Sequence, residues 1–182
     1  MDIQTTAIKE LFLLKLKSFD DARGSFVKTF NDDFFADNGL DIEIKEVYFS
    51  TSHKDVIRGM HFQTPPHEHT KIVFVTDGEI LDVVLDLRKN SKTYGQYYST
   101  IISKNSQTAL IIPHGMAHGF KSLKNNTNVV YMQTTCYAPT SDTGIRYDSF
   151  GFEWNCAKPI LSERDLSFKK FKDFDTPFEM KL

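Results

Sequence analysis

The chain has 182 residues, of which 40% are hydrophobic and 25% are charged, and its formal net charge is −2. This length suits one domain, residues 1–182, with a substantial buried core. The charge balance lacks the basic surface that nucleic-acid binding requires, and no apolar run approaches the roughly 20 residues of a membrane span.

The cysteines and the N-terminus indicate the compartment. Cys136 and Cys156 have neither metal-binding nor redox spacing, which predicts two reduced thiols. No basic segment followed by an apolar core is visible at the N-terminus, as a signal peptide would require. We therefore expect a cytoplasmic protein with no membrane or nucleic-acid partner.

The predicted elements are mainly short strands. Gly, Pro and Asn interrupt the chain about every ten residues between Arg23 and Gly151, and the 16 Phe and seven Tyr favour strands. In chain order we expect a helix at 32–38, strands at 47–50, 71–75, 80–87, 97–102, 108–112 and 129–137, and a helix at 162–172. Ser162 would cap the second helix, with Asp165 at its third position. The pattern predicts an all-β sandwich or barrel with short flanking helices, and a tail from Phe174 packed on the body or on a partner subunit.

Two local patterns refine this prediction. Asp77-Gly78 lies between two predicted strands and is typical of a tight hairpin. In the strand 80–87 the odd positions are apolar, whereas Asp82 and Asp86 interrupt the other face. This alternation predicts a strand with one face in the core.

Groups able to do acid–base chemistry occur in three clusters. These are residues 58–63 with His61, residues 113–120 with His118, and Tyr131 with Tyr137 on one face of one predicted strand. Lys71 opens another strand ten residues after His61. A histidine can remove a proton next to a carbonyl, Lys71 or His118 can stabilise the enolate, and a tyrosine can return a proton on the opposite face. Together these groups indicate a metal-free epimerase.

Simpler interpretations remain open for each group. A strand histidine is usually a hydrogen-bonded structural residue, Lys71 alone is more often a solvated charge, and Tyr131 and Tyr137 are typical core aromatics. Arg58 could hold a loop.

A metal-binding site is the more specific alternative to a metal-free epimerase. His67-Glu68-His69 has ligand-like spacing, and residues 113–118 resemble the second motif of metal-binding cupins. That pattern needs a Glu four or five residues after the second His, where this chain has Val-Phe-Val at 73–75. We therefore expect no metal and no other cofactor.

Several motifs in a fixed order make the chain resemble the dTDP-4-dehydrorhamnose 3,5-epimerases, metal-free members of the cupin superfamily. The motifs are Asp-Ala-Arg-Gly at 21–24, Arg-Gly-Met-His-Phe-Gln at 58–63 with Pro65-Pro66, Lys-Ile-Val at 71–73, residues 78–88, Ser-Lys-Thr-Tyr-Gly at 91–95, residues 112–120, residues 131–139, and Leu-Ser-Glu-Arg-Asp at 161–165. The resemblance spans about Arg23 to Asp165 and implies a cupin-type jelly roll.

The resemblance also implies roles for single residues. His61 would be the base, with Asp165 raising its basicity and fixing its tautomer. Lys71, helped by His118, would stabilise the enolate, and Tyr131 would be the acid on the far face.

At the nucleotide end the resemblance implies that Arg23 and Arg58 grip the diphosphate. It also implies a homodimer, because family members are usually dimers that exchange N-terminal strands. The wider substrate-binding set that we expect comprises Arg23, Lys28, Glu46, Tyr48, Arg58, Gln63, Cys136, Tyr137, Asp142 and Arg164.

Departures from the family pattern cluster at this nucleotide end. Cys136 replaces a Tyr that stacks on thymine, and Glu46-Val47-Tyr48 replaces a Gln-x-Asn pair. Lys28 replaces a Glu, and another acidic position is kept only as Asp142. The catalytic positions are intact, so we expect the chemistry to be retained and the nucleotide or the sugar to differ.

We expect inversion of carbon 3, carbon 5 or both in a nucleoside-diphosphate 4-keto sugar used for bacterial surface polysaccharides. A GDP-4-keto-heptose is a candidate, because Glu46 could accept hydrogen bonds from guanine, and a dTDP-4-keto-6-deoxyhexose is the other. The alternatives are an epimerase of carbon 3 alone, a nucleotide-sugar ketoisomerase, a non-catalytic sugar-binding cupin and a metal-dependent oxygenase.

Overall fold

The computed structural model describes residues 1–180, which form mainly two β-sheets. The strands are β1 (Asp2–Thr5), β2 (Phe12–Lys15), β3 (Lys17–Asp21), β4 (Gly24–Lys28), β5 (Glu46–Ser52), β6 (Ile57–Gln63), β7 (Lys71–Asp77), β8 (Glu79–Asp86), β9 (Tyr97–Ser103), β10 (Thr108–Ile112), β11 (Met116–Ser122), β12 (Thr127–Gln133) and β13 (Asp142–Gly144). The helices are α1 (Asp32–Asp37), α2 (Glu163–Ser167) and a 3₁₀ turn, η1 (Phe171–Asp173).

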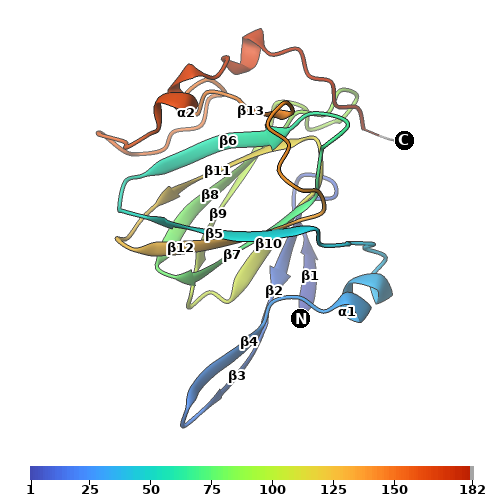
Figure 1. The fold of residues 1–182 in the computed structure, drawn as a ribbon, viewed down its shortest axis with the longest axis vertical. Coiled ribbons are helices and arrows are strands. Elements are labelled where there is room, and N and C mark those ends of the chain that lie inside the picture. Colours follow the sequence, from blue (N-terminus) through green and yellow to red (C-terminus); the bar gives the residue numbers. More distant parts are fainter. Residues whose placement is uncertain (181–182) are drawn as a thin grey trace.

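The two large sheets face each other as a jelly roll (Figure 1). Their strand orders are β1-β2-β10-β7-β12-β5 and β13-β6-β11-β8-β9, with antiparallel pairing throughout. The expected all-β jelly roll with short helices is confirmed. Asp77-Gly78 does form a turn, but it joins β7 of one sheet to β8 of the other, so the hairpin prediction is wrong.

All six predicted strands are present; the strand at 108–112 has the predicted bounds, and the other five have one or both ends shifted. The strand predicted at 129–137 ends at Gln133, so Tyr137 lies beyond it and does not share a strand face with Tyr131. The pattern does not reveal β6 and β11, because Gly59 and Gly119 interrupt their apolar periodicity.

Strand β8 is buried on both faces, which corrects the prediction of one core face. Ile80 and Val84 pack in the core between the sheets, whereas Val83 and Leu85 pack in a second core on the outer side. Asp82 and Asp86 are both fully buried. The predicted solvent face is instead the barrel interior, and its carboxylates need partners there.

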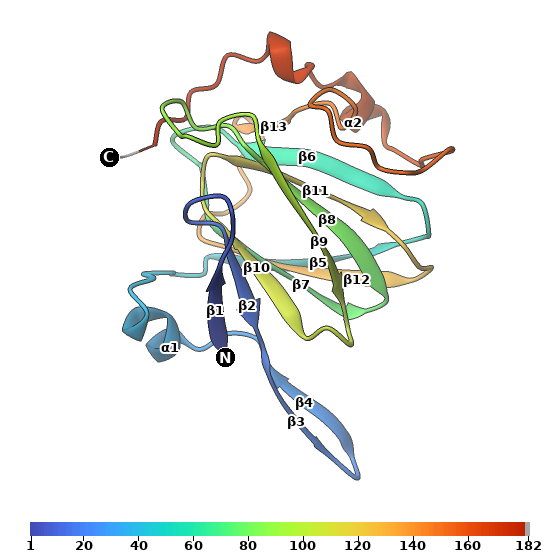
Figure 2. The ribbon, with the colours of Figure 1, turned by 180° about the vertical axis from the view of Figure 1, so that it is seen from behind.

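After β2 the chain leaves the two sheets as the β3–β4 hairpin and then returns as α1 to the outer side of the six-stranded sheet. Asn31 caps α1 by accepting a hydrogen bond from the backbone N–H of Phe34, which confirms the predicted first helix. Phe35 of this helix is buried against the outer side of the six-stranded sheet. The β3–β4 hairpin projects away from both sheets (Figures 1 and 2).

The C-terminal segment packs on the body, as one of the two expected arrangements proposed (Figure 2). Phe178 is buried and its ring meets that of Phe62 on β6, the strand that carries His61. Thr176 donates its hydroxyl to the carbonyl oxygen of Leu87 at 2.6 Å. The tail therefore supports β6 from outside the barrel.

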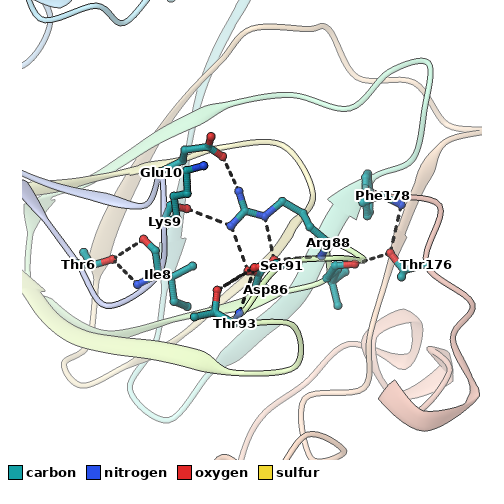
Figure 3. Close-up of polar contacts among 11 residues, drawn as sticks. Thr6, Ile8, Lys9, Glu10, Asp86, Arg88, Ser91, Thr93, Thr176 and Phe178 are labelled. Atoms are coloured by element: carbon teal, nitrogen blue, oxygen red, sulfur yellow. Dashed lines mark hydrogen bonds and ion pairs between the residues drawn. The ribbon is translucent and has the colours of Figure 1, made fainter. Parts of the chain in front are cut away.

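Arg88 joins the end of β8 to the loop between β1 and β2 (Figure 3). Its buried guanidinium contacts both oxygens of Asp86, the Glu10 carboxylate at 2.6 Å and the Lys9 carbonyl oxygen at 3.0 Å. Asp86 also accepts hydrogen bonds from Ser91 and Thr93. Burial tends to raise the Asp86 pKa, but Arg88 above all, with these two hydroxyls, outweighs burial and lowers it.

The second helix is shorter than predicted. Ser162 caps α2 by accepting from the N–H of Asp165, as expected, but Phe168 has extended backbone and ends the helix. The chain resumes only as η1, so the predicted helix at 162–172 is corrected to two short turns. Within residues 1–180 no helix has the length and apolar character needed to span a membrane.

Candidate active site

A pocket of about 380 Å³ lies where β5 and β7 begin and β6 and β12 end. It is lined by Glu46, Tyr48, His61, Phe62, Gln63, His69, Lys71, Gln133, Tyr137, Asp142 and Arg164. Eight of these eleven positions belong to the predicted site, namely all but Phe62, His69 and Gln133. A larger pocket of about 510 Å³ near the N-terminus contains none of the predicted site residues.

The pair formed by His61 and Asp165 lies at the edge of this pocket. His61 Nε2 is 2.8 Å from Asp165 Oδ1, and the N–H of Gly59 donates to Asp165 Oδ2 at 3.1 Å. Burial tends to raise the Asp165 pKa, but His61 and the Gly59 N–H outweigh it and hold the pKa below its usual value. Since an ionised carboxylate can only accept, the proton of a neutral His61 ring is on Nε2 and the lone pair is on Nδ1.

Two glycines set the path of the histidine strands. At Gly59 φ is +140°, and a Cβ there would lie 2.5 Å from the Cα of Gly119 on β11. The strands can therefore approach closely only without side chains at this point. The register shifts just after His118, so that His118 and His61 face each other as cross-strand partners.

His118 forms a second pair with Asp82, deep between the sheets. Its Nε2 is 2.8 Å from Asp82 Oδ2, and both side chains are buried. Burial lowers the His118 pKa, opposed in part by Asp82. The sequence contained a signal for Asp82 that alternation alone missed: it stands between Ile80 and Val84, so a charge at this position is placed on an apolar face.

Lys71 is a buried cation of the pocket. Its side chain is buried, and Nζ donates to the carbonyl oxygen of His61 at 3.5 Å. Burial lowers its pKa to about 8, against the attraction of Asp142 and Asp82. Lys71 is therefore largely protonated at neutral pH yet poorly neutralised by its surroundings, and it suits a developing anion.

Tyr131 belongs to the sheet opposite His61, and its ring stacks on Tyr48 with centroids 4.8 Å apart. Burial raises the pKa of Tyr131 strongly and that of Tyr48 to about 12, so both phenols are protonated at neutral pH. Tyr48 lines the pocket, and its oxygen accepts from Gln133 Nε2 at 2.7 Å. The register places Gln133 between Lys71 and Glu46, a neighbour that the sequence alone does not mark.

The remaining lining residues brace the pocket mouth. Glu46 accepts from the N–H of Tyr137 at 2.9 Å, and Gln63 accepts from the N–H of Ala138 at 2.7 Å. On the other side Arg164 pairs with Asp142 at 2.6 Å.

A second pocket of about 320 Å³ continues past His61 and includes Arg58 and Arg164. Arg58 donates to Ser52 Oγ at 3.0 Å and is exposed. His61 and Arg164 line both pockets, so they lie where the two spaces adjoin.

Three expected binding residues do not line either pocket. Cys136 is an exposed free thiol near the carbonyl oxygen of Lys45. Arg23 and Lys28 lie on the projecting hairpin, where Arg23 pairs with Asp21 in solvent. A single chain does not bring them to His61.

The residues of the metal interpretation are also separated. His67 is exposed, whereas His69 is buried and lines the main pocket. Among residues 1–180, no three His, Cys, Asp or Glu side chains are grouped to hold a metal ion.

Comparison with known proteins identifies the family. The family model described as dTDP-4-dehydrorhamnose 3,5-epimerase matches residues 5–173. A protein of that name from Shigella flexneri is 34% identical over 178 residues, covering 96% of this chain and 98% of the relative. One from Methanothermobacter thermautotrophicus is 36% identical and covers 92% and 93%.

A solved structure agrees. The dTDP-6-deoxy-D-glucose-3,5-epimerase of Legionella pneumophila, in complex with dTDP-4-keto-L-rhamnose, superposes with a TM-score of 0.94 and 31% identity over 99% of both chains. The chain is an isomerase and belongs to the dTDP-4-dehydrorhamnose 3,5-epimerase family.

Proposed function

We propose that this epimerase inverts a carbon next to the ketone of a nucleoside-diphosphate 4-keto sugar through an enolate. His61 Nδ1 takes the proton from the carbon, and the electron pair moves to the keto oxygen. Lys71, with His118 nearby, stabilises that oxygen. As the electron pair returns to the carbon, Tyr131 gives it a proton on the opposite face. Solvent then takes the extra proton from His61 and returns one to Tyr131, so the reaction needs no oxidant.

The observation that carries this proposal is the division of the groups between the sheets. His61 stands on the five-stranded sheet, whereas Lys71 and Tyr131 stand on the six-stranded sheet. Inversion requires that a proton leave one face of the ring and return to the other. A sugar inserted between two sheets meets its base on one side and its acid on the other.

The number of inverted carbons depends on how the ring is presented to one base. Carbons 3 and 5 both flank the ketone, so His61 could serve both, and an acid misplaced for one of them would leave an epimerase of the other. A ketoisomerase would share the enolate but move the carbonyl to carbon 3, which product analysis separates. The relatives named as 3,5-epimerases favour epimerisation.

The nucleotide is dTDP or GDP. The relatives are named for dTDP sugars. Glu46 lines the pocket mouth, and after accepting from Tyr137 its carboxylate still has acceptor capacity for the N1–H and amino group of guanine. We propose GDP-4-keto-heptose as the alternative to a dTDP-4-keto-6-deoxyhexose, in either case for a surface polysaccharide sugar made in the cytoplasm.

We propose that the chain acts as a homodimer whose hairpins reach the partner. Phe19 and Phe26 of the β3–β4 hairpin are 50% and 63% exposed, and Val47 and Phe49 on the edge strand β5 are 55% and 69% exposed. Apolar surface of this kind favours burial against another chain. Arg23 at the hairpin tip would then meet the diphosphate in the partner's pocket.

The test is proton NMR in D₂O with separate dTDP- and GDP-linked 4-keto sugars. Deuterium at carbons 3 and 5 would support double epimerisation, and deuterium at one carbon would support the single-carbon enzyme. Exchange with only the dTDP-linked or only the GDP-linked sugar would identify the nucleotide. Absence of exchange with every 4-keto sugar tested, including the heptose, would refute the proposal. Sedimentation of the wild type and of a Phe26→Ser variant would test the dimer.

A further inference from the structure

His69 lines the main pocket but has no part in the chemistry above. It stands two residues before Lys71, and both side chains line the pocket. Its side chain is only 7% exposed. Buried polar atoms normally have hydrogen-bond partners, so the partners of both ring nitrogens of His69 need to be identified.

The neighbouring amide of Gln63 indicates which nitrogen of His69 accepts. The backbone N–H of Ala138 can only donate, and it donates to Gln63 Oε1 at 2.7 Å. The other end of Gln63 is therefore the amino group, which donates to the carbonyl oxygen of His67 at 2.8 Å and faces His69 Nδ1 at 3.3 Å. An amino group only donates, and the Thr135 hydroxyl, also 3.3 Å from Nδ1, can donate as well, so both neighbours suit Nδ1 as the acceptor.

The ring carries one proton. Burial, with the Lys71 charge as the second cause, lowers the His69 pKa to about 3, so the imidazole is neutral at physiological pH. With Nδ1 accepting, that proton is on Nε2. His69 Nε2 is buried and has no hydrogen-bond partner among the described residues.

A buried N–H donor with no acceptor costs free energy unless a ligand supplies the acceptor. We propose that His69 Nε2–H donates to a hydroxyl oxygen of the bound sugar next to the ketone, and so selects sugars that carry this oxygen. The inference rests on the proposed function for the identity of the ligand. The sugar is the relevant part because Lys71, the nearest charged neighbour, holds the keto oxygen in that scheme.

The role is one of specificity and not of catalysis. Because its pKa is far below neutral, His69 does not exchange protons with the sugar in the working pH range. Its loss should therefore weaken binding of the sugar and leave the base and acid steps intact.

Binding to unreactive ligands tests the inference without requiring turnover. We would compare dTDP with dTDP-glucose, and GDP with GDP-mannose, by calorimetry on wild type, His69→Leu and His69→Gln. His69→Leu should weaken binding of the sugar ester about tenfold to a hundredfold and leave binding of the free nucleotide unchanged, whereas His69→Gln, which keeps an N–H donor, should recover part of the loss. His67→Leu, an exposed imidazole of the same loop, is the matched control and should change neither.

The wild-type protein supplies a second readout. In long-range ¹H–¹⁵N spectra of labelled histidine, His69 should be neutral from pH 5 to 8 with its proton on Nε2, and that proton should shift when the sugar ester binds but not when the free nucleotide binds. A proton on Nδ1, or equal loss of nucleotide and ester binding in His69→Leu, would overturn the inference. So would unchanged binding of both ligands in that variant.

This test is independent of the proposed reaction. Failure of every 4-keto sugar to exchange deuterium would refute the epimerase scheme, whereas the His69 result depends only on the difference between ester and free nucleotide. A well-folded His69→Leu variant with normal ester binding would refute the inference and leave the scheme intact.

Discussion

Replacing Asp165 with Asn should reverse the tautomer of the proposed base. The N–H of Gly59 donates to Asp165 Oδ2, so it would hold the oxygen of an Asn and turn the amino group toward His61. That amino group can only donate, so His61 Nε2 would have to accept and the ring proton would move to Nδ1. The atom that should take the proton from the sugar would then already carry one.

The size of the effect follows from two losses. The charge-assisted contact between His61 and Asp165 is worth about 1.5 to 3 kcal/mol, and forcing two donors together at a part-buried site costs about 1 to 3 kcal/mol more. The sum of about 2.5 to 6 kcal/mol corresponds to roughly 10²- to 10⁴-fold in rate. Asp165→Ala imposes no tautomer, so it should lose only about 10- to 100-fold.

Stability should change in the opposite order. Asn keeps an acceptor for the buried N–H of Gly59, whereas Ala leaves it unsatisfied at a cost of about 1 to 3 kcal/mol. We therefore expect Asp165→Asn to be the more stable variant in urea titrations and the less active one in deuterium exchange. If Asp165→Ala is both less stable and less active than Asp165→Asn, the tautomer argument is wrong and Asp165 is a structural residue.

Four further predictions follow from the site and its support. His61→Asn should lower deuterium exchange at every carbon by about 10³-fold or more, and near-normal exchange would show another base. Tyr131→Phe should retain exchange but lose inversion; loss of inversion in a Tyr48→Phe control instead would make Tyr48 the acid. Lys71 is charged below its pKa of about 8, so kcat/KM should fall as the pH rises past that value. If the same alkaline fall in kcat/KM remains in Lys71→Arg, the assignment is wrong. Arg88→Met should cost about 3 to 5 kcal/mol in urea unfolding, because Asp86 stays buried without its guanidinium, and a cost below about 1 kcal/mol would refute this.

The sequence predicts the strands of the fold better than their pairing. Alternation and turn residues locate six strands because these signals are local. They do not show that β7 and β8 belong to different sheets, because the Asp77-Gly78 turn is compatible with a hairpin or with a crossing. Strand β12 ends early for a similar reason: aromatic residues continue to Tyr137, but the ladder partners end at Glu46 and Lys71.

For the site too, the sequence predicts individual residues better than the contacts that sheet register creates. The motifs bring His61, Lys71 and Asp142 to one pocket, and the base and its carboxylate partner are found together although 104 positions separate them. Partners made by register alone were missed, above all Gln133 beside Tyr48. Arg23 shows the remaining limit, since a hairpin that leaves the body serves a pocket only through an assembly that one chain does not contain.

The two His–Asp pairs differ in how far their imidazole rings are open to solvent. His61 is partly open, with a side chain 31% exposed, and its carboxylate comes from a helix outside the barrel. His118 is only 3% exposed, and its carboxylate comes from the barrel interior. A base must meet its substrate and exchange its proton with solvent, which the first environment permits and the second does not. Burial lowers the His118 pKa, so this ring should remain neutral and act as a hydrogen-bond group toward the anion, while His61 alone carries protons. Both carboxylates are buried, so the exposure of the two rings is what suits these cross-strand partners to different functions.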